Sequence, residues 1–495
     1  MVTNRNRAAP RILRLAGGIA AVLCVPASAA AATTWSVTSC LDDGGAGTLR
    51  GIINATGTHS GDTVDLGSCS NSTITLEAGA GGITIPQDSL KIYGPNSGTV
   101  TIDASSLDPT TYSAFYHTGS GTLTVRGLTI SGGHVNRQGN ALGGCVYSRA
   151  NVTLFLTTVT GCTATSDGPA LGGGIYAKGF VYGVVSNVSG NTANGNGATS
   201  GGGIFAKGAA FLRFSTLSGN SASAASGSAR GGGIYGGDVT FQYSTVSGNH
   251  ASAPAGVEGG GVFTKQTLVL RSSTISGNTS GGRAGGAFVT AAFGMYNSTV
   301  SGNSAATKGG ALYLNFYSNF YNSTIAFNTA TVGSPGVLMY GANQSKVMMQ
   351  STLMSNNTSG ASDTDLTVIN PDRVTFNSSP ANNLVRATKV TGLPGDTIFG
   401  TCPLLGSLRD NGGLTRTHQL LSTSIAIDAG NDVTIDPLSN PKTPFAYDQR
   451  GPAALNGTLD YARVFGAHAD IGAYEVQKDA IVFSAGFDGC NPLAP

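Results

Sequence analysis

The stretch Ser244-Thr-Val-Ser-Gly-Asn249 decides the fold, because variants of it recur nine times between Thr129 and Asn356. Over the first six occurrences the spacing is 29 residues each time. A fixed period of this length is typical of a solenoid, in which each repeat buries its apolar face only by stacking on its neighbours. The aliphatic position of the motif then forms one column of the stack: Ile130, Val159, Val188, Leu217, Val246 and Ile275.

Within one repeat the apolar residues alternate with a period of two, as in Val239, Phe241 and Tyr243, which is strand spacing. The next inward residue, Val246, comes three positions later and indicates a bend. Gly248-Asn249 supplies a second bend, since both residue types tolerate left-handed backbone angles. A third strand opens with a glycine run, as in 231–235. Three short strands per coil predict an all-β fold, a right-handed parallel β-helix.

After Asn278 the spacing falls to 25 residues, because the segment between the asparagine and the glycine run becomes shorter. In the longer repeats this segment, 221–230 and 250–258, is made of small and polar residues. It shows no alternation that a core could use. We therefore expect it to form a loop outside the stack.

The composition agrees with an ordered solenoid. The 495 residues include 74 glycines, yet 40% are hydrophobic and recur at a strict period, which argues against a low-complexity chain. Only 11% are charged and the formal net charge is +2. This balance argues against a nucleic-acid partner. Beyond the N-terminus no apolar stretch approaches the ~18 residues of a transmembrane span.

The N-terminus has the organisation of a secretory signal peptide over 1–31. Four arginines between Arg5 and Arg14 precede an apolar run over 15–25 and a small-residue stretch over 26–32. We therefore expect a secreted or outer-surface protein. Its mature form would lack Cys24, because this residue lies in the signal peptide that is cleaved off. An even number of cysteines remains, and an exported chain can pair them in several ways. We expect Cys40–Cys69, and packing or a disulfide rather than a metal site at Cys145 and Cys162. The other two are Cys402 and Cys490.

The N-terminal segment 32–72 is expected to cap the solenoid with a short helix over 48–55, followed by the first strand over 61–66. This stretch resembles the Leu-Arg-x-Ala-Ile helix and Gly-Asp-Thr-Ile strand that open many secreted bacterial β-helix proteins of the pectin-lyase-like fold. In that family the helix plugs the first coil. The resemblance implies the same role for Leu49, Ile52 and Ile53.

The repeat region is expected to cover 73–398, after which a second signature begins. Four motifs follow in order over 410–421, 424–430, 447–451 and 470–475. Together they resemble the choice-of-anchor domain that follows such β-helices in bacterial surface proteins, here 399–478, a small β-rich domain. The tail 479–495 resembles the ends of secreted gammaproteobacterial proteins. The resemblance implies export and surface retention, and it implies no reaction.

Catalysis requires acids that the solenoid barely contains. Many parallel β-helices are polysaccharide lyases or glycosidases. A lyase of this fold needs clustered carboxylates that bind Ca²⁺ and a basic residue. A glycosidase needs two carboxylates ~5–10 Å apart. Between Arg126 and Gln350 the acids are Asp167, Asp238 and Glu258, at different points of the repeat. We predict no catalytic residue and no cofactor. A lyase or glycoside hydrolase, and a purely structural surface protein, are the alternatives.

An aromatic column next to the glycine runs predicts a surface for carbohydrate contact. Its immediate neighbours form a rival apolar column that includes Val146 and Ile175. Adjacent strand residues face opposite ways, so one column points outward or into a loop-covered groove. Aromatics exposed in series would contact a glycan, whereas buried ones would belong to the core. The column is Tyr147, Tyr176, Phe205, Tyr235 and Phe263.

Lys178 and Lys207 also share a column and could form a cationic stripe for an anionic glycan. The competing interpretation is that these lysines keep the outer strand face soluble and block edge pairing, and the sequence favours it.

The asparagines of the motif are expected to form a structural hydrogen-bonded ladder and no metal site. They are Asn191, Asn220, Asn249, Asn278, Asn303, Asn328 and Asn356. The polar residues of the C-terminal motifs are expected to stabilise turns, with a Ca²⁺ site as the alternative. They are Asp410, His418, Asp428, Asp448, Arg450, Asp470 and Glu475.

Taken together, these patterns predict a secreted or cell-surface, non-catalytic β-helix protein. Its long β face would contact a polysaccharide or cell-surface glycan. The sequence leaves the oligomeric state and the ligand open.

Overall fold

The computed structural model describes residues 31–477, except 111–112, 343, 361–362, 378 and 458. The predicted signal peptide, apart from Ala31, and the predicted tail 479–495 lie outside the described residues. So do Cys24 and Cys490.

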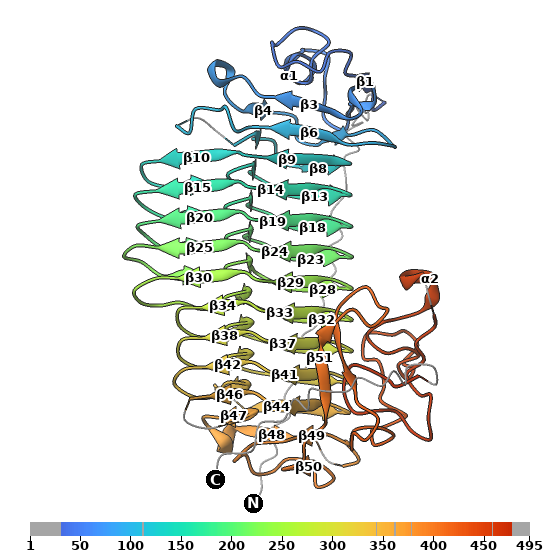
Figure 1. The fold of residues 1–495 in the computed structure, drawn as a ribbon. Coiled ribbons are helices and arrows are strands. Elements are labelled where there is room, and N and C mark those ends of the chain that lie inside the picture. The colour runs from blue at the N-terminus through green and yellow to red at the C-terminus, as the bar shows by residue number, and fades with distance from the viewer. Residues whose placement is uncertain are drawn as a thin grey trace, which may run out of the picture.

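The described chain winds into a parallel β-helix whose coils stack along one axis (Figure 1). Sheet A, with thirteen strands, runs the whole length of the stack. Its strands are β1 (Thr34–Ser36), β2 (Thr63–Asp65), β5 (Leu90–Tyr93), β8 (Thr122–Arg126), β13 (Asn151–Phe155), β18 (Val181–Val184), β23 (Ala210–Arg213), β28 (Val239–Gln242), β32 (Leu268–Arg271), β36 (Phe293–Tyr296), β40 (Ser318–Tyr321), β44 (Ser345–Gln350) and β48 (Val374–Phe376).

From β2 to β48, each strand of sheet A is followed along the chain by a strand of sheet B. Its strands are β3 (Ser72–Thr75), β6 (Val100–Asp103), β9 (Leu128–Ser131), β14 (Thr158–Thr160), β19 (Asn187–Ser189), β24 (Thr216–Ser218), β29 (Thr245–Ser247), β33 (Thr274–Ser276), β37 (Thr299–Ser301), β41 (Thr324–Ala326), β45 (Leu353–Ser355), β49 (Leu384–Val385) and β50 (Ile398–Phe399).

Sheet C carries the strands that follow the glycine runs. They are β4 (Ile83–Ile85), β7 (Phe115–His117), β12 (Val146–Ser148), β17 (Ile175–Ala177), β22 (Ile204–Ala206), β27 (Ile234–Gly236), β31 (Val262–Thr264), β35 (Ala287–Val289), β39 (Leu312–Leu314), β43 (Val337–Met339) and β47 (Leu366–Val368).

The strand pairing confirms the predicted register and the parallel β-helix. Val159 pairs with Ile130 above it and Val188 below it, and Val246 pairs with Leu217 and Ile275. The inward side chains of these columns form the main hydrophobic core, since they are essentially unexposed. The repeat therefore specifies both the strands and the partners that they stack on.

The segments expected to loop outside the stack contain stacked strands, at 221–224, 229–230 and 250–252, so the prediction of a loop was wrong for these residues. They add a nine-stranded sheet D and a four-stranded sheet E between sheets B and C. The alanines at alternate positions, such as Ala222 and Ala224, are buried, and Ala224 packs in a small cluster with Val257. Alternation of alanine with serine is still a period of two, and such small side chains pack against a narrow extension of the coil.

Sheet D comprises β10 (His134–Arg137), β15 (Thr163–Ser166), β20 (Thr192–Gly195), β25 (Ser221–Ala224), β30 (His250–Ser252), β34 (Thr279–Ser280), β38 (Ser304–Ala305), β42 (Thr329–Ala330) and β46 (Thr358–Ser359). Sheet E comprises β11 (Ala141–Leu142), β16 (Ala170–Leu171), β21 (Thr199–Ser200) and β26 (Ala229–Arg230).

The N-terminal end is covered by helix α1 (Leu49–Asn54), which buries Leu49, Ile52 and Ile53 against the first coil. The Thr48 side chain caps this helix by accepting a hydrogen bond from the Gly51 amide. Cys40 and Cys69 form a disulfide across this region. The first strand of the stack is β1, which lies before the strand predicted to be first and pairs with β2. The Asp62 carboxylate holds this segment in place by accepting hydrogen bonds from the Thr33 amide and the Trp35 indole. The stack thus begins inside the segment expected to be a cap.

The asparagine ladder runs from Asn191 to Asn357. Each amide Nδ2 donates to the Oδ1 of the next asparagine, as from Asn249 to Asn278 at 2.9 Å, and to a carbonyl of the preceding coil, as from Asn249 to Leu217. At the upper end the Asn191 Oδ1 accepts from the amide of Cys162, which is bonded to Cys145 in a second disulfide. The ladder therefore ties the turns of successive coils together.

The placement of Asn356 in the ladder was wrong, because Asn357 is the rung. Asn328 donates to the Asn357 Oδ1 at 2.8 Å. Asn356 instead has a φ of +59° and occupies the left-handed position that glycine holds in most other coils, such as Gly248. Asparagine tolerates this conformation, so two consecutive asparagines left the sequence register ambiguous by one residue. The Asn356 Oδ1 accepts a hydrogen bond from Arg386.

The ladder ends on the buried carboxylate of Asp365. One oxygen accepts from the amide and side chain of Asn357, at 3.1 and 2.7 Å, and the other accepts from the Ala387 amide at 2.7 Å. Burial raises the pKa of Asp365 to about 6, against the opposing effect of these hydrogen bonds.

The raised pKa of Asp365 predicts a pH-dependent stability. The folded protein holds this proton up to about pH 6, whereas the unfolded chain releases it near pH 4, so Asp365 favours folding below pH 4 and loses that contribution as the pH rises to 6. The loss is up to about 3 kcal/mol. We expect the difference in melting temperature between the wild type and Asp365→Asn to change over this pH window. A constant difference from pH 4 to pH 7 would contradict the raised pKa.

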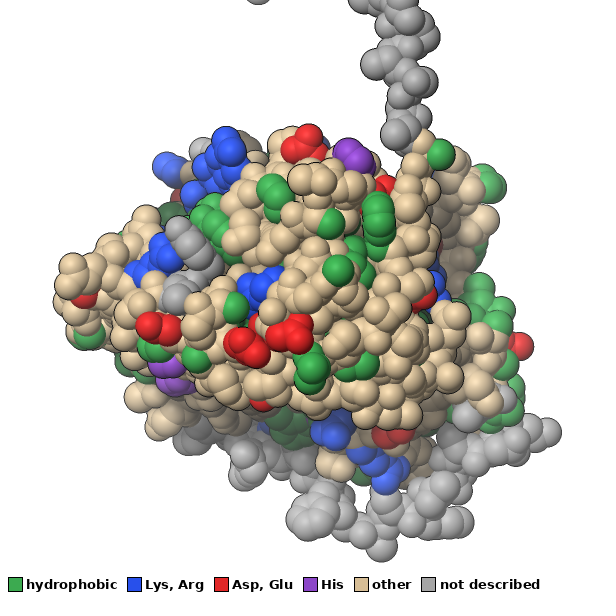
Figure 2. Space-filling view, turned by 90° about the horizontal axis from the view of Figure 1, so that it is seen from above, with side chains coloured by type: hydrophobic (Ala, Val, Ile, Leu, Met, Phe, Trp, Pro, Cys, Tyr) green, Lys and Arg blue, Asp and Glu red, His purple; other side chains and the backbone are tan. Residues whose placement is uncertain are grey.

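The described residues also include three single-turn 3₁₀ helices: η1 (Gly67–Cys69), η2 (Ala78–Ala80) and η3 (Pro371–Arg373). No helix among the described residues is long and apolar enough to cross a membrane. Viewed from the N-terminal end, most of the visible surface is neither charged nor hydrophobic, and Lys, Arg, Asp and Glu side chains are scattered in small groups (Figure 2).

The described residues after β50, up to 477, form a small C-terminal unit that packs across the outer faces of sheets A and B in the lower coils (Figure 1). It contains an antiparallel pair, β51 (Leu405–Arg409) with β52 (Thr417–Leu420), and helix α2 (Ala453–Asn456). Polar contacts attach it to the solenoid: Gln449 bonds to Thr299 and Thr274, and Asp436 pairs with Arg271 at 2.6 Å.

Candidate functional site

The predicted aromatic column lies on the outer face of sheet C. Residues such as Val146 and Ile175 point into the main core, so their neighbours Tyr147 and Tyr176 point away from it. The column is longer than the sequence pattern predicts. Strand pairing adds Tyr116 above Tyr147, and Phe288 and Tyr313 below Phe263. These three were missed because the glycine run before each strand is shortened or altered, which hid the register.

The rings stack face to face along the solenoid axis. Centroids of neighbouring rings lie 4.7 to 5.6 Å apart with interplanar angles from 3° to 21°. Each ring face is therefore occupied by the next ring. The column can offer only ring edges and tyrosine hydroxyls to a ligand, and it provides no series of open ring faces on which sugars could stack.

The lower part of the column is covered, which argues against the predicted contact role for three of its members. Phe205, Tyr235 and Phe263 are 9%, 7% and 4% exposed. They form a satellite hydrophobic cluster with Ala284 and Leu338, among other residues.

Cationic side chains lie over this covered part. The Arg230 guanidinium is 5.4 Å from the Phe263 ring centroid, and Arg283 is 5.6 Å from that of Tyr313. Glu258 holds Arg230 in place at 2.9 Å. These contacts shield the aromatic cluster further from solvent. Its rings therefore act mainly as a second hydrophobic core.

Burial along the column predicts two different mutational effects. Tyr235→Ala is expected to cost roughly 3 kcal/mol, because a large buried ring is replaced by a cavity and its neighbours Phe205 and Phe263 lose their stacking partner. Tyr147→Ala is expected to cost clearly less, because Tyr147 is only partly buried. Chemical denaturation of both variants checks this. Equal losses would show that the column is uniformly buried.

The upper end of the column is accessible. Tyr116, Tyr147 and Tyr176 are each partly exposed. Desolvation raises the pKa of Tyr147 and Tyr176 above the ordinary value, so both hydroxyls stay protonated at neutral pH and can donate hydrogen bonds. We call these three residues the tyrosine edge.

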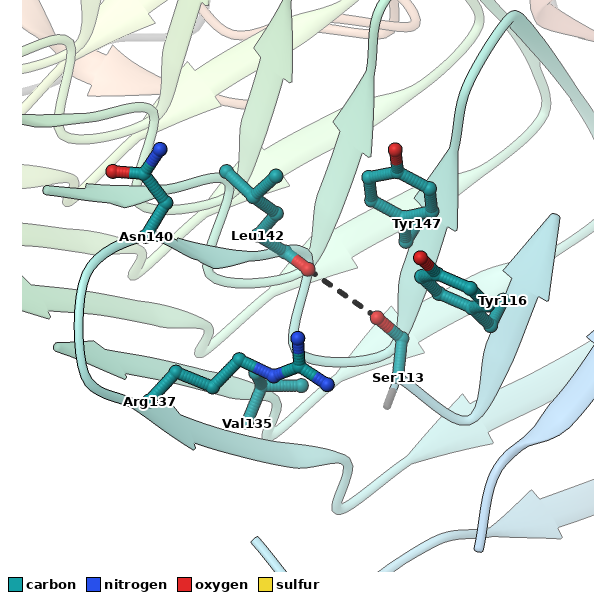
Figure 3. A pocket seen from close by; sticks show the side chains of 7 residues that line it. All are labelled: Ser113, Tyr116, Val135, Arg137, Asn140, Leu142 and Tyr147. Atoms are coloured by element: carbon teal, nitrogen blue, oxygen red, sulfur yellow. Dashed lines mark hydrogen bonds between the residues drawn. The ribbon is translucent and has the colours of Figure 1, made fainter. Parts of the chain in front are cut away.

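A small pocket of about 80 Å³ opens beside the tyrosine edge. Figure 3 shows Tyr116 and Tyr147 side by side on one wall, with Arg137 pointing toward Ser113 on another. The Ser113 hydroxyl donates to the Leu142 carbonyl at 3.3 Å, which joins the two sides. The remaining lining residues are Val135, Asn140 and Leu142. The pocket has room for a water or a small polar substituent of a ligand, and it combines guanidinium, amide and hydroxyl groups.

The predicted lysine column lies next to the tyrosine edge. Backbone pairing aligns Lys207 with Lys178, and Lys178 with Arg149, and all three side chains are exposed. Lys265 lies further down, with its ammonium group 5.8 Å from the Tyr235 ring centroid. The exposed tyrosines therefore have cationic neighbours on one side and Arg137 on the other.

The three acids between Arg126 and Gln350 serve separate local contacts. Glu258 is paired with Arg230, Asp238 accepts from the Thr267 amide, and Asp167 accepts from the Gly139 amide. These contacts do not bring the three carboxylates together into the acid pair that a glycosidase needs.

The polar residues of the C-terminal motifs form a hydrogen-bonded network. The Arg450 guanidinium pairs with Asp448 at 2.6 Å between the rings of Tyr461 and Tyr474, whose centroids are 3.8 and 3.9 Å away. The His418 ring bridges Ser301 and the Gly406 carbonyl, and burial lowers its pKa to about 4.

The acids of the same network bind backbone amides. Glu475 accepts from the amides of Phe465 and Asp470, and Asp470 accepts from those of Asp428 and Val476. Burial raises the pKa of Glu475 and of Asp470. Asp410 accepts from the Gly412 amide in a turn. Within the described ranges, no group of three or more His, Cys, Asp and Glu side chains is arranged to hold a metal ion.

Comparison with known proteins supports no functional assignment. No family model matches this chain. No curated protein matches its sequence. Among solved structures, the chain is similar to the crystal structure of pectate lyase Pel9A, with a TM-score of 0.42 and 13% identity, over 90% of this chain and 96% of that chain. A likeness this weak carries no inference about activity, and the assignment as a parallel β-helix rests on the strand pairing described above.

Proposed function

We propose that this protein is an exported, non-catalytic β-helix that contacts carbohydrate through the tyrosine edge. One observation carries the proposal: the stacked aromatic column is closed over most of its length, yet at its upper end three tyrosines reach the surface beside the pocket of Arg137 and Asn140. Hydroxyls on successive coils repeat at about the 4.8 Å strand spacing. Such a row can bond to the hydroxyl groups of an extended glycan chain.

The neighbouring charges favour an acidic glycan. Arg137 lies on one side of the tyrosine edge, and Arg149, Lys178 and Lys207 lie exposed on the other. Guanidinium and ammonium groups bind carboxylate or sulfate substituents by charge-assisted hydrogen bonds. The ligand class that fits best is therefore a polysaccharide with carboxylate or sulfate groups.

Export and surface location are part of the same proposal. The N-terminal segment has the pattern of a signal peptide. The Cys40–Cys69 and Cys145–Cys162 disulfides are of the kind that persists in oxidising compartments. The motifs that resemble a choice-of-anchor domain suggest retention at the bacterial outer surface.

Removing two hydroxyls tests the contact without disturbing the stack. We expect Tyr147→Phe/Tyr176→Phe to keep the melting temperature of the wild type and to weaken binding to acidic polysaccharides by roughly tenfold, or about 1.4 kcal/mol. The measurement is binding to a panel of pectins, alginates and glycosaminoglycans. Tyr317→Phe is the matched control, since Tyr317 is 52% exposed away from the pocket.

The same panel separates the alternatives. Unchanged binding by the double variant would contradict the tyrosine edge as the contact. New unsaturated ends or reducing sugars would show a lyase or glycosidase, and the non-catalytic proposal would be wrong. No binding to any glycan would favour a purely structural surface protein.

A further inference from the structure

A second pocket lies at the N-terminal end of the solenoid, on the outer face of sheet A. Its volume is about 520 Å³, within the ~300–1,000 Å³ range of pockets that hold small ligands. Strands β1, β2, β5 and β8 contribute its floor, and the loops after β2 and β5 contribute a wall. We call it the sheet A pocket. It is separate from the tyrosine edge, whose residues belong to sheet C.

Three side chains on the floor come from equivalent positions of successive coils. Asp65 pairs with Tyr93, and Tyr93 pairs with Arg126, in the parallel register. The residue before each of them is fully buried in the main core, so these three side chains point outward. The strand spacing puts the positions of Asp65 and Arg126 ~10 Å apart, with Tyr93 between them.

The two charged side chains have no ion-pair partner within the part of the chain that the structure describes. The Arg126 guanidinium lies 5.6 Å from the Tyr93 ring centroid, and its side-chain N–H groups donate no hydrogen bond to described residues. One Asp65 oxygen accepts from the Gly67 amide at 3.2 Å, and the other accepts from no described residue. The guanidinium and one carboxylate oxygen are therefore available to a ligand.

The two loops of the wall are tied to each other. The Ser70 hydroxyl donates to the Ser97 carbonyl at 2.9 Å, and the Asn71 side chain accepts from the Thr99 amide at 3.2 Å. The first loop is also held by the Cys40–Cys69 disulfide. A wall that is fixed in this way loses little conformational freedom when a ligand binds.

The lining of the sheet A pocket favours a ligand rich in hydroxyl groups. Besides the two charged residues it consists mainly of hydroxyl and amide side chains and of glycine backbone, and its apolar surface comes from Tyr93 and Pro95. A peptide with apolar side chains would find little surface to bury them, whereas sugar hydroxyls can bond to the polar groups. These polar groups belong to Thr34, Thr63, Ser70, Asn96 and Ser97.

We propose that the sheet A pocket binds a short saccharide in which an acidic unit is linked to a neutral one. Arg126 holds the carboxylate or sulfate of the acidic unit by charge-assisted hydrogen bonds. Asp65 accepts hydrogen bonds from hydroxyl groups of the neutral unit, and it repels a second acidic group at that end. The opposite charges at the two ends of the pocket thus set the direction of the saccharide. This site goes beyond the tyrosine edge and does not depend on it.

The first test is calorimetric binding to the full mature chain carrying Tyr147→Phe/Tyr176→Phe, which removes two hydroxyls of the tyrosine edge. The probes are glucuronic acid linked to N-acetylglucosamine, digalacturonate and maltose. We expect saturable binding of the first, which we call the mixed disaccharide, and at least roughly tenfold weaker binding of maltose.

Adding Arg126→Gln should weaken binding of the mixed disaccharide by roughly tenfold, because glutamine keeps hydrogen-bonding groups but loses the charge. Arg213→Gln is the matched control. Arg213 lies in the same outward column three coils further down, away from the pocket, so its replacement should leave the affinity unchanged.

Asp65→Asn tests the direction of the saccharide. The asparagine oxygen can still accept from the Gly67 amide, so the turn should stay folded. The starting chain should prefer the mixed disaccharide over digalacturonate, and Asp65→Asn should reduce that preference, because the repulsion of the second acidic group is gone. An unchanged preference would contradict the role of Asp65.

Three results would overturn the proposal: no binding of the mixed disaccharide, binding that Arg126→Gln leaves unchanged, or binding of triglutamate as tight as that of the mixed disaccharide. The last result would show that the pocket selects charge alone. Failure of the tyrosine edge would appear separately, as unchanged polysaccharide binding by the tyrosine double variant.

Discussion

Replacing Arg450 with methionine is expected to release the C-terminal unit from the solenoid while the solenoid stays folded. The guanidinium is almost fully buried, pairs with Asp448, and donates to the backbone carbonyls of Asn411 and Glu475. Without it, the Asp448 carboxylate is left in the interior with no countercharge. Breaking a buried pair by removing one partner costs roughly 3–5 kcal/mol. Hydrogen exchange should show faster opening of residues 411–475 and little change in sheets A and B.

A double variant separates charge from packing. Asp448→Asn/Arg450→Met should recover much of the loss, because no uncompensated charge remains. Arg230→Met is the control for removing an arginine from an ion pair, since its side chain is 39% exposed and paired with Glu258, and it should cost less than about 1 kcal/mol. If Arg450→Met and Arg230→Met cost the same, the buried network does not hold the unit in place.

Asn249→Ala is expected to destabilise the solenoid by roughly 3 kcal/mol. The amide of Asn249 donates to Asn278 and to the Leu217 carbonyl, and its oxygen accepts from the amide and the side chain of Asn220. Alanine leaves these groups buried without partners, and each such group costs about 1–3 kcal/mol. Thermal and chemical unfolding of the variant measures the loss.

Asn194→Ala is the matched control for the ladder. Asn194 also belongs to a β strand of the solenoid, but it is exposed on sheet D. Its replacement should change stability by less than about 0.5 kcal/mol. Similar melting temperatures for the two alanine variants would show that the ladder contributes no more than a surface asparagine.

The candidate site was only partly visible in the sequence. The column from Tyr147 to Phe263 could be found because the glycine runs repeat, and alternation showed that one of two columns leaves the core. Alternation cannot tell an exposed face from one that a second layer covers. Phe205 and Tyr235 are buried in a cluster to which residues of several coils contribute.

Other features depended on contacts between segments far apart in the chain. The pocket joins Ser113, Arg137 and Tyr147 from different segments of the chain, and no motif links them. Likewise, the polarity of the turn after sheet A changes from Val185 to Asn297 along the stack. That change becomes meaningful only when the C-terminal unit is seen to cover the lower turns and leave the upper ones bare.

The sequence by itself determined the coil of this protein. A 29-residue period, alternating strand residues and a recurring Gly-Asn turn specify which residues stack, because a repeat can bury its apolar face only against a copy of itself. Tertiary structure decided which outer faces stay open. Exposure depends on what other segments lie over a face, and the C-terminal unit reaches the solenoid by long-range packing that no local pattern encodes.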